Sequence, residues 1–306
     1  MRIKLCGYLA CALMLAAGLV SCQQEEDRPH GVQYPIVFSN SSETRATATE
    51  DDLMKDGFTV YAFVQGNAGS TSFAKDVVYN ATYEVWAFES PEYWIPNTDY
   101  YFKAFYPKAL TSDTLKVDTS KSDLDFTISD FDITSQTDLL VAEAQAVVNP
   151  GEAAPTSGNI VKLNFQHLLA NVVVKVKSEI SNVSVGSVSF SNIANKGDFD
   201  GESWTHNEQT SLSKLKSIAL VKDADFVDIT DGGFLVIPQV ITPNAHKVNV
   251  ETTHKQYSDI GIPNIKWESG KQYTYTLIIK QENIIFDQLS VEEWDEENAT
   301  GSVIIK

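Results

Sequence analysis

Segments in which apolar and polar residues alternate at every second position run through most of this chain. Such alternation is typical of β-strands that bury one face. Turn-forming residues separate the segments, as at Asn149-Pro150-Gly151 and Asp231-Gly232-Gly233. No stretch of about twelve residues carries a helical stripe. The sequence therefore predicts an all-β fold, and its clearest strands are Phe58 to Val64, Thr82 to Phe88, Tyr100 to Tyr106, Leu139 to Val141 and Val161 to Phe165.

One of the expected strands changes its pattern in the middle. Between Val183 and Phe190 the apolar positions are 183 and 185, and then 188 and 190. An extra residue in one strand of an antiparallel pair shifts the alternation in this way. We therefore predict a β-bulge at Gly186-Ser187.

The segment Asn149 to Gly158 is rich in turn formers and poor in large apolar residues, which is typical of a boundary between domains. A chain of 306 residues with 43% hydrophobic content can supply two ordinary cores. The spacing of the strands suggests β-sandwiches. We therefore expect an N-terminal β-sandwich domain over 51–157 and a C-terminal one over 158–306.

The N-terminus has the pattern of a bacterial lipoprotein signal peptide. Arg2 and Lys4 precede an apolar run from Leu5 to Val20, which ends in Leu19-Val20-Ser21-Cys22. The run is shorter than the roughly 20 residues of a spanning helix. We predict that residues 1–21 are removed and that Cys22 carries the lipid.

Residues 22–50 read as a polar leader with one β-prone exception, Val32 to Phe38, whose proline suits an edge strand. The chain has no arginine after Arg45, because the only others are Arg2 and Arg28. One interpretation is compositional drift, since lysine replaces arginine on many solvated surfaces. The other is that an arginine-specific protease could cut only this N-terminal part.

Composition and motifs give little support to catalysis. Cys6 and Cys11 lie in the signal peptide and Cys22 would be lipidated, so no cysteine remains for a disulfide, a thiolate nucleophile or a zinc site. The histidines lack metal-ligand spacing and no Gly-x-Ser-x-Gly motif occurs. Acidic stretches such as Asp223 to Asp231 lack the calcium-loop pattern. We therefore predict a non-enzyme with no cofactor and no metal.

The net charge of −18 makes nucleic acid an improbable partner, because the surface repels phosphate. Aromatic residues concentrate between Tyr83 and Tyr106, and their alternation favours a core role. Tyr93 and Trp94 lie between Pro91 and Pro96 in an expected loop. We predict that this pair is available for surface contact.

Five stretches together resemble the fimbrillin family of Bacteroidia, the lipoprotein pilins of type V fimbriae. They occur in family order over most of the chain that follows the signal peptide. The stretches are Tyr101 to Pro107, Asp138 to Ala142, Leu163 to Ala170, Phe234 to Gln239, and Tyr273 to Leu277 continuing through Val291 to Trp294.

The resemblance implies two transthyretin-like β-sandwich domains in tandem and assembly of subunits by strand exchange. It also implies a surface-exposed lipoprotein of the cell outer membrane, and the acidic run Glu25-Glu26-Asp27 resembles the signal for that location. Proteolysis after an arginine would remove the first strand, and a strand of a neighbouring subunit would fill the groove. In this sequence Arg45, followed by Ala46, matches the cleavage position. The removable strand would be 32–38, with Val32, Tyr34, Ile36 and Phe38 at alternate positions.

Two functions follow from these observations. The first is a structural or tip subunit of a cell-surface fimbria, whose partners are other fimbrial subunits and the lipid on Cys22. The alternative is a monomeric surface lipoprotein that binds glycans or host proteins through Tyr93 and Trp94. The stretch from Asn283 to Lys306 suits either a native last strand or a donor arm.

Overall fold

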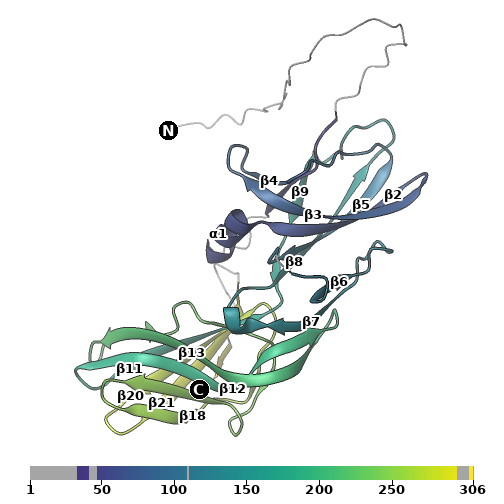
Figure 1. The fold of residues 1–306 in the computed structure, drawn as a ribbon. Coiled ribbons are helices and arrows are strands. Elements are labelled where there is room, and N and C mark those ends of the chain that lie inside the picture. Colours follow the sequence, from purple (N-terminus) through teal and green to yellow (C-terminus); the bar gives the residue numbers. More distant parts are fainter. Residues whose placement is uncertain (1–32, 41–46, 109, 295–302, 306) are drawn as a thin grey trace, which may run out of the picture. The chain divides into compact units, whose positions relative to one another are not determined.

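The computed structural model describes residues 33–40, 47–108, 110–294 and 303–305. The expectation of an all-β fold is confirmed, because strands form most of the described chain and the helical elements are α1 (Thr47–Asp56) and the short 3-10 turn η1 (Ile133–Ser135) (Figure 1). In this described part, no helix has the length and apolar character needed to cross a membrane.

The first sheet has eight strands in the order β10-β8-β5-β2-β3-β4-β1-β9. Its end strands β9 and β10 are consecutive in the chain and are separated by Asn164 and Phe165, so the sheet curls around its own core. The strands are β1 (Val37–Asn40), β2 (Phe58–Gly66), β3 (Gly69–Asn80), β4 (Val85–Phe88), β5 (Thr98–Tyr106), β8 (Leu140–Val148), β9 (Ile160–Leu163) and β10 (Gln166–His167).

A second core lies between two further sheets, of which one has the order β14-β11-β20-β21-β22, with β15 also paired to β11. Phe190 of the facing sheet contacts this layer, since its ring centroid lies 5.6 Å from Phe234 and 6.2 Å from Tyr275. The strands of this layer are β11 (Ala170–Ser178), β14 (Val227–Asp228), β15 (Phe234–Val236), β20 (Lys271–Ile279), β21 (Ile284–Glu293) and β22 (Val303–Ile305).

The facing sheet has the order β18-β17-β12-β7-β6, with β13 paired to β12. Its strands are β6 (Leu115–Val117), β7 (Phe126–Asp132), β12 (Val183–Phe199), β13 (Trp204–Leu220), β17 (Lys247–Thr252) and β18 (Gln256–Gly261), and the short strands β16 (Val240–Ile241) and β19 (Ile265–Lys266) form a separate pair. The register of β12 shifts between Val185 and Ser187 against both β13 and β17. This confirms the bulge predicted at Gly186-Ser187.

The segment between Asn149 and Gly158 connects β8 to β9, and strands from both sides of it enter the same sheets. β6 and β7 precede it but belong to the sheet of β12. β9 and β10 follow it but belong to the first sheet. The composition of the 149–158 segment indicated a boundary but could not show which strands pair across it. The division into domains at 157 and 158 stays a prediction.

Helix α1 begins within the segment that we predicted as a leader. Over Asp51 to Asp56, the part of the helix whose side chains are described, Leu53 is the one fully buried side chain, so no repeated apolar stripe is present there. The helix ends at Asp56, and the N–H of the next residue, Gly57, donates to the Leu53 carbonyl at 2.9 Å. Gly57 has a φ of +73°, which glycine adopts without strain, and this conformation turns the chain into β2.

Candidate functional site

The predicted removable strand lies inside the first sheet. β1 is antiparallel to β4, with Val37 opposite Ala87 and Phe38 opposite Trp86. On its other side β1 is parallel to β9, over four pairs from Val37↔Ile160 to Asn40↔Leu163. Strand pairing on both sides means that loss of β1 would leave two backbone edges without a partner.

Two side chains of this segment enter the core. Ile36 is 2% exposed and Phe38 is 0% exposed, whereas Tyr34 is 42% exposed. Ile36 and Phe38 are two residues apart, so the pleat turns both to the same face. Tyr34 has the same parity, so its exposure is not due to the pleat; it lies ahead of the first residue of β1. Val32 lies outside the described residues. The residues predicted at alternate positions therefore divide into an exposed Tyr34 and a buried pair, Ile36 and Phe38.

The ring of Phe38 is enclosed by aromatic side chains. Its centroid lies 5.2 Å from Phe88, 5.5 Å from Phe102 and 6.3 Å from Phe58, each with edge-to-face geometry. Such contacts add about 0.5–1.5 kcal/mol per pair beyond area burial. Removal of β1 would therefore expose an aromatic groove between β4 and β9.

The segment of Tyr93 and Trp94 holds the start of the removable strand. The Ile36 N–H donates to the Glu92 carbonyl at 2.7 Å, and the Trp94 N–H donates to the Tyr34 carbonyl at 3.1 Å. Sequence reasoning missed this pairing, because the β-prone character of 32–38 does not show which distant segment lies beside it. The prolines on either side of Tyr93 and Trp94 indicated a loop instead.

Tyr93 and Trp94 differ in exposure. Tyr93 is 42% exposed, but Trp94 is only 4% exposed and its ring lies 4.8 Å from Tyr100 in edge-to-face geometry. The prediction of surface contact is therefore corrected for Trp94, whose indole is a core side chain. The strand-like pairing of this segment turns Trp94 inward and Tyr93 outward.

Helix α1 is anchored beside the same groove. The Trp86 indole N–H donates to the Leu53 carbonyl at 3.5 Å, and Trp86 is the residue opposite Phe38. The Tyr106 hydroxyl donates to the Asp56 carboxylate at 3.5 Å. Burial, together with the carboxylates of Asp52, Asp56 and Asp138, raises the pKa of Tyr106 to about 12. Helix α1 thus has attachments of its own that do not involve β1.

The processing residues Cys22, Arg45 and Ala46 lie outside the described residues. The described chain stops at Asn40, at the end of β1, and resumes at Thr47, the first residue of α1. Any cut after Arg45 would therefore separate β1 from α1.

His167 contributes to structure at the end of the first sheet. It is 4% exposed, its Nδ1 lies 2.6 Å from an Asp138 carboxylate oxygen, and its ring stacks on Trp294 at 3.7 Å. The Trp294 N–H donates to the Gly270 carbonyl at 2.9 Å. These contacts join the end of β21 to β10.

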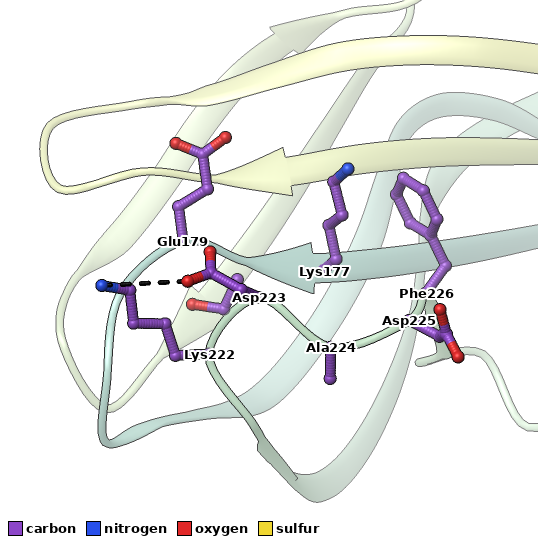
Figure 2. Close-up of a pocket in the computed structure, with 8 residues that line it drawn as sticks. Lys177, Glu179, Lys222, Asp223, Ala224, Asp225 and Phe226 are labelled. Atoms are coloured by element: carbon purple, nitrogen blue, oxygen red, sulfur yellow. Dashed lines mark ion pairs between the residues drawn. The ribbon is translucent and has the colours of Figure 1, made fainter.

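A shallow cleft of about 520 Å³ lies where β11 ends and the 222–226 segment passes it (Figure 2). Charges of both signs line it, and Lys222 and Asp223 form an ion pair at 3.9 Å. The Lys177 ammonium lies 4.9 Å from the centre of the Phe226 ring. Within the described ranges, no three histidine, cysteine or carboxylate side chains converge as a metal site would need.

Comparison with known proteins identifies the class to which this fold belongs. The model of the fimbrillin-like family matches residues 44–294. The chain therefore belongs to the fimbrillin-like family, as the five ordered stretches indicated. This family supports a fimbrial or adhesion-related role at the cell surface and association with other fimbrial subunits. No curated protein matches the chain.

Two solved structures agree with this chain at the level of the fold. A structure from Bacteroides ovatus that is assigned to cell adhesion is 16% identical, with a TM-score of 0.56 over 87% of this chain and 100% of that one. A similarly assigned structure from Bacteroides uniformis is 16% identical, with a TM-score of 0.53 over the same shares. The tip fimbrial protein Mfa3 from Porphyromonas gingivalis is 12% identical, with a TM-score of 0.36 over 78% of this chain and 94% of that chain.

Proposed function

We propose that this protein is a non-catalytic structural or tip subunit of a cell-surface fimbria, built from two transthyretin-like β-sandwich domains. It is exported as a lipoprotein precursor with its lipid on Cys22, and it stays at the outer surface of the outer membrane until it is processed. Cleavage after Arg45 then frees the N-terminal segment, and a strand of a neighbouring subunit takes the place of β1.

The observation that carries the proposal is the position of β1. The buried side chains of Ile36 and Phe38 and the two-sided pairing of β1 make this segment a part of the core, yet its covalent link to the other described strands runs through its C-terminal end. After a cut in the 41–46 segment, only non-covalent contacts would hold it. An incoming strand that offers the same hydrogen bonds and equal apolar side chains could then replace it.

The matched variant for the first test is Arg45→Lys, which keeps the charge and removes the arginine-specific cut. Purified precursor is treated with an arginine-specific protease and followed by light scattering and electron microscopy. We expect the native chain to lose the segment through Arg45 and to form polymers, and Arg45→Lys to remain monomeric. Native protein that is cut, releases its strand and stays monomeric would argue against the proposal.

A second test uses the strand itself. A synthetic peptide with the sequence of residues 32–40 should refill the groove of cut protein and slow polymerisation. The same peptide with alanine at the positions of Ile36 and Phe38 should not, since these two side chains provide most of the apolar burial. Equal inhibition by the two peptides would remove the pocket-filling part of the proposal.

The alternative was a monomeric lipoprotein that binds glycans or host proteins through Tyr93 and Trp94. Only one of these two residues is exposed. Trp94 is buried, and Tyr93 lies in a segment that pairs with residues 34–36. We therefore do not propose recognition through this pair.

A further inference from the structure

A second cleft, of about 290 Å³, lies at the ends of three adjacent strands of the first sheet. Gly66 of β2 is opposite Thr98 of β5, and Thr98 is opposite Val148 of β8, so these three strand ends are held in register. Thr98 and Val148 are buried and belong to the cleft lining. The cleft is therefore placed on paired strands, with the neighbouring loops at its rim.

The lining is rich in carboxamides. Gln65, Asn67, Asn97 and Asn149 contribute amide groups, and Asp99 contributes the single charged side chain. A carboxamide both donates and accepts hydrogen bonds, whereas a carboxylate accepts only. Together they complement a ligand whose groups can do both, as hydroxyl groups can. Val147, which is 52% exposed, adds a small apolar area to this polar lining.

Several of these polar groups have no partner inside the protein. Among the described residues, the side chains of Asn67, Asn97 and Asp99 take part in no hydrogen bond or ion pair. Asn97 and Asp99 are at the same time only partly exposed. Such side chains are partly shielded from water and make no hydrogen bond within the protein. A ligand can therefore hydrogen-bond to them without breaking contacts inside the protein.

The backbone offers little to a peptide at this place. Gly66 pairs with both β3 and β5, and Thr98 pairs with both β2 and β8. Recognition by strand addition needs an unpaired edge, which β2 and β5 lack here. In the described part of the sheet, β10 covers β8 only at Leu140 and Val141, so a strand could add beside Val147, but β5 would separate it from Gln65 of β2. A hard cation is also disfavoured, because one carboxylate is far fewer than the several oxygens that calcium requires. Recognition by the groups on β2 and β5 must therefore come from side chains.

The geometry points to a saccharide subsite in this cleft, formed by Gln65, Asn67, Asn97 and Asp99 around Val147, that takes one uncharged pyranose ring. A volume at the lower end of small-ligand sites fits a single ring rather than an extended chain. The carboxylate of Asp99 accepts hydroxyl groups and repels acidic sugars. This subsite is independent of strand exchange, since neither β1 nor Arg45 takes part in it.

The subsite is tested with the full chain and defined probes. Saturation-transfer difference NMR is run with the methyl glycosides of glucose, galactose, mannose and N-acetylglucosamine, and with sialyllactose as an acidic probe. We expect millimolar binding of at least one neutral glycoside and weaker binding of sialyllactose. Absence of saturation transfer from every neutral glycoside, or binding of the acidic probe alone, would overturn the proposal.

Variants then locate the binding. Gln65→Ala and Asp99→Ala each remove a hydrogen-bonding group and should weaken binding by about tenfold. Gln209→Ala is the matched control, because Gln209 is also an exposed glutamine on a strand. It lies on β13, which belongs to a different sheet from β2, β5 and β8. Circular dichroism checks that all three variants keep the fold. Unchanged affinity in both cleft variants would place the ligand elsewhere and contradict the assignment.

Discussion

The side chain of Phe38 contacts aromatic rings from three other strands, β2, β4 and β5. We predict that Phe38→Ala lowers the free energy of unfolding by about 3–5 kcal/mol, because it leaves a cavity in an aromatic core. Tyr34→Ala, in the same segment but 42% exposed, should change it by less than about 1 kcal/mol. Urea denaturation of both variants measures the difference. Similar losses in the two variants would show that β1 is not held by its buried face.

Trp94 gives a second test at the scale of single residues. Since its indole is 4% exposed and packs on Tyr100 and Phe102, Trp94→Ala should destabilise the protein by about 3–5 kcal/mol. Tyr93→Ala, its exposed neighbour, should have a small effect. Thermal unfolding of the two variants distinguishes a core tryptophan from a surface one, for which both changes would be mild.

At the scale of elements, the sequence predicted the type of structure better than its pairing. The alternation around Phe58 and Tyr100 corresponds to β2 and β5, and the change of parity after Val185 corresponds to the bulge in β12. The pairing of β1 with β9 was beyond prediction, because alternation shows which face is buried but not which distant strand lies alongside. The segment Thr82 to Glu84, expected as strand, forms a turn before β4.

The cleft at the ends of β2, β5 and β8 was beyond prediction for the same reason, since the sequence does not show which distant strands are neighbours. The carboxamides of the saccharide cleft come from three separate parts of the chain, which only the register of β2, β5 and β8 brings together. Trp94 shows the converse error. Neighbouring prolines suggested an exposed loop, but the backbone of this segment pairs with residues 34–36 and buries the indole.

The end of α1 provides a prediction for an element. A Cβ on Gly57 would lie 2.2 Å from the Val77 carbonyl oxygen, and the φ of +73° is unfavourable for alanine. Gly57→Ala should therefore cost at least about 1–2 kcal/mol. Gly186→Ala is the control, since its nearest neighbour would be 3.9 Å away. Chemical denaturation that shows no larger loss for Gly57→Ala would mean that the chain can leave α1 by another route.

At the scale of the whole molecule, strand β5 links the two apolar cores. Phe105 packs in the core between the two sheets of β11 and β12, whereas Tyr106, the next residue, packs in the core of the first sheet. Alternate side chains of one strand thus stabilise both cores. A change at Tyr106 should therefore lower the stability of both cores together. Ionisation of the Tyr106 hydroxyl is one such change.

Burial and the nearby carboxylates raise the pKa of Tyr106 from 10.0 to about 12. A group whose pKa is higher in the folded than in the unfolded state stabilises the folded protein. This contribution to the free energy of unfolding is complete below pH 10 and is lost as the pH rises towards 12. We predict that the native protein loses stability faster than Tyr106→Phe over this interval, as measured by urea denaturation at successive pH values. Tyr83→Phe, at a tyrosine that is 48% exposed, is the control and should follow the native curve, because it leaves Tyr106 in place. Parallel curves for the native protein and Tyr106→Phe would show that the Tyr106 hydroxyl has no part in this loss.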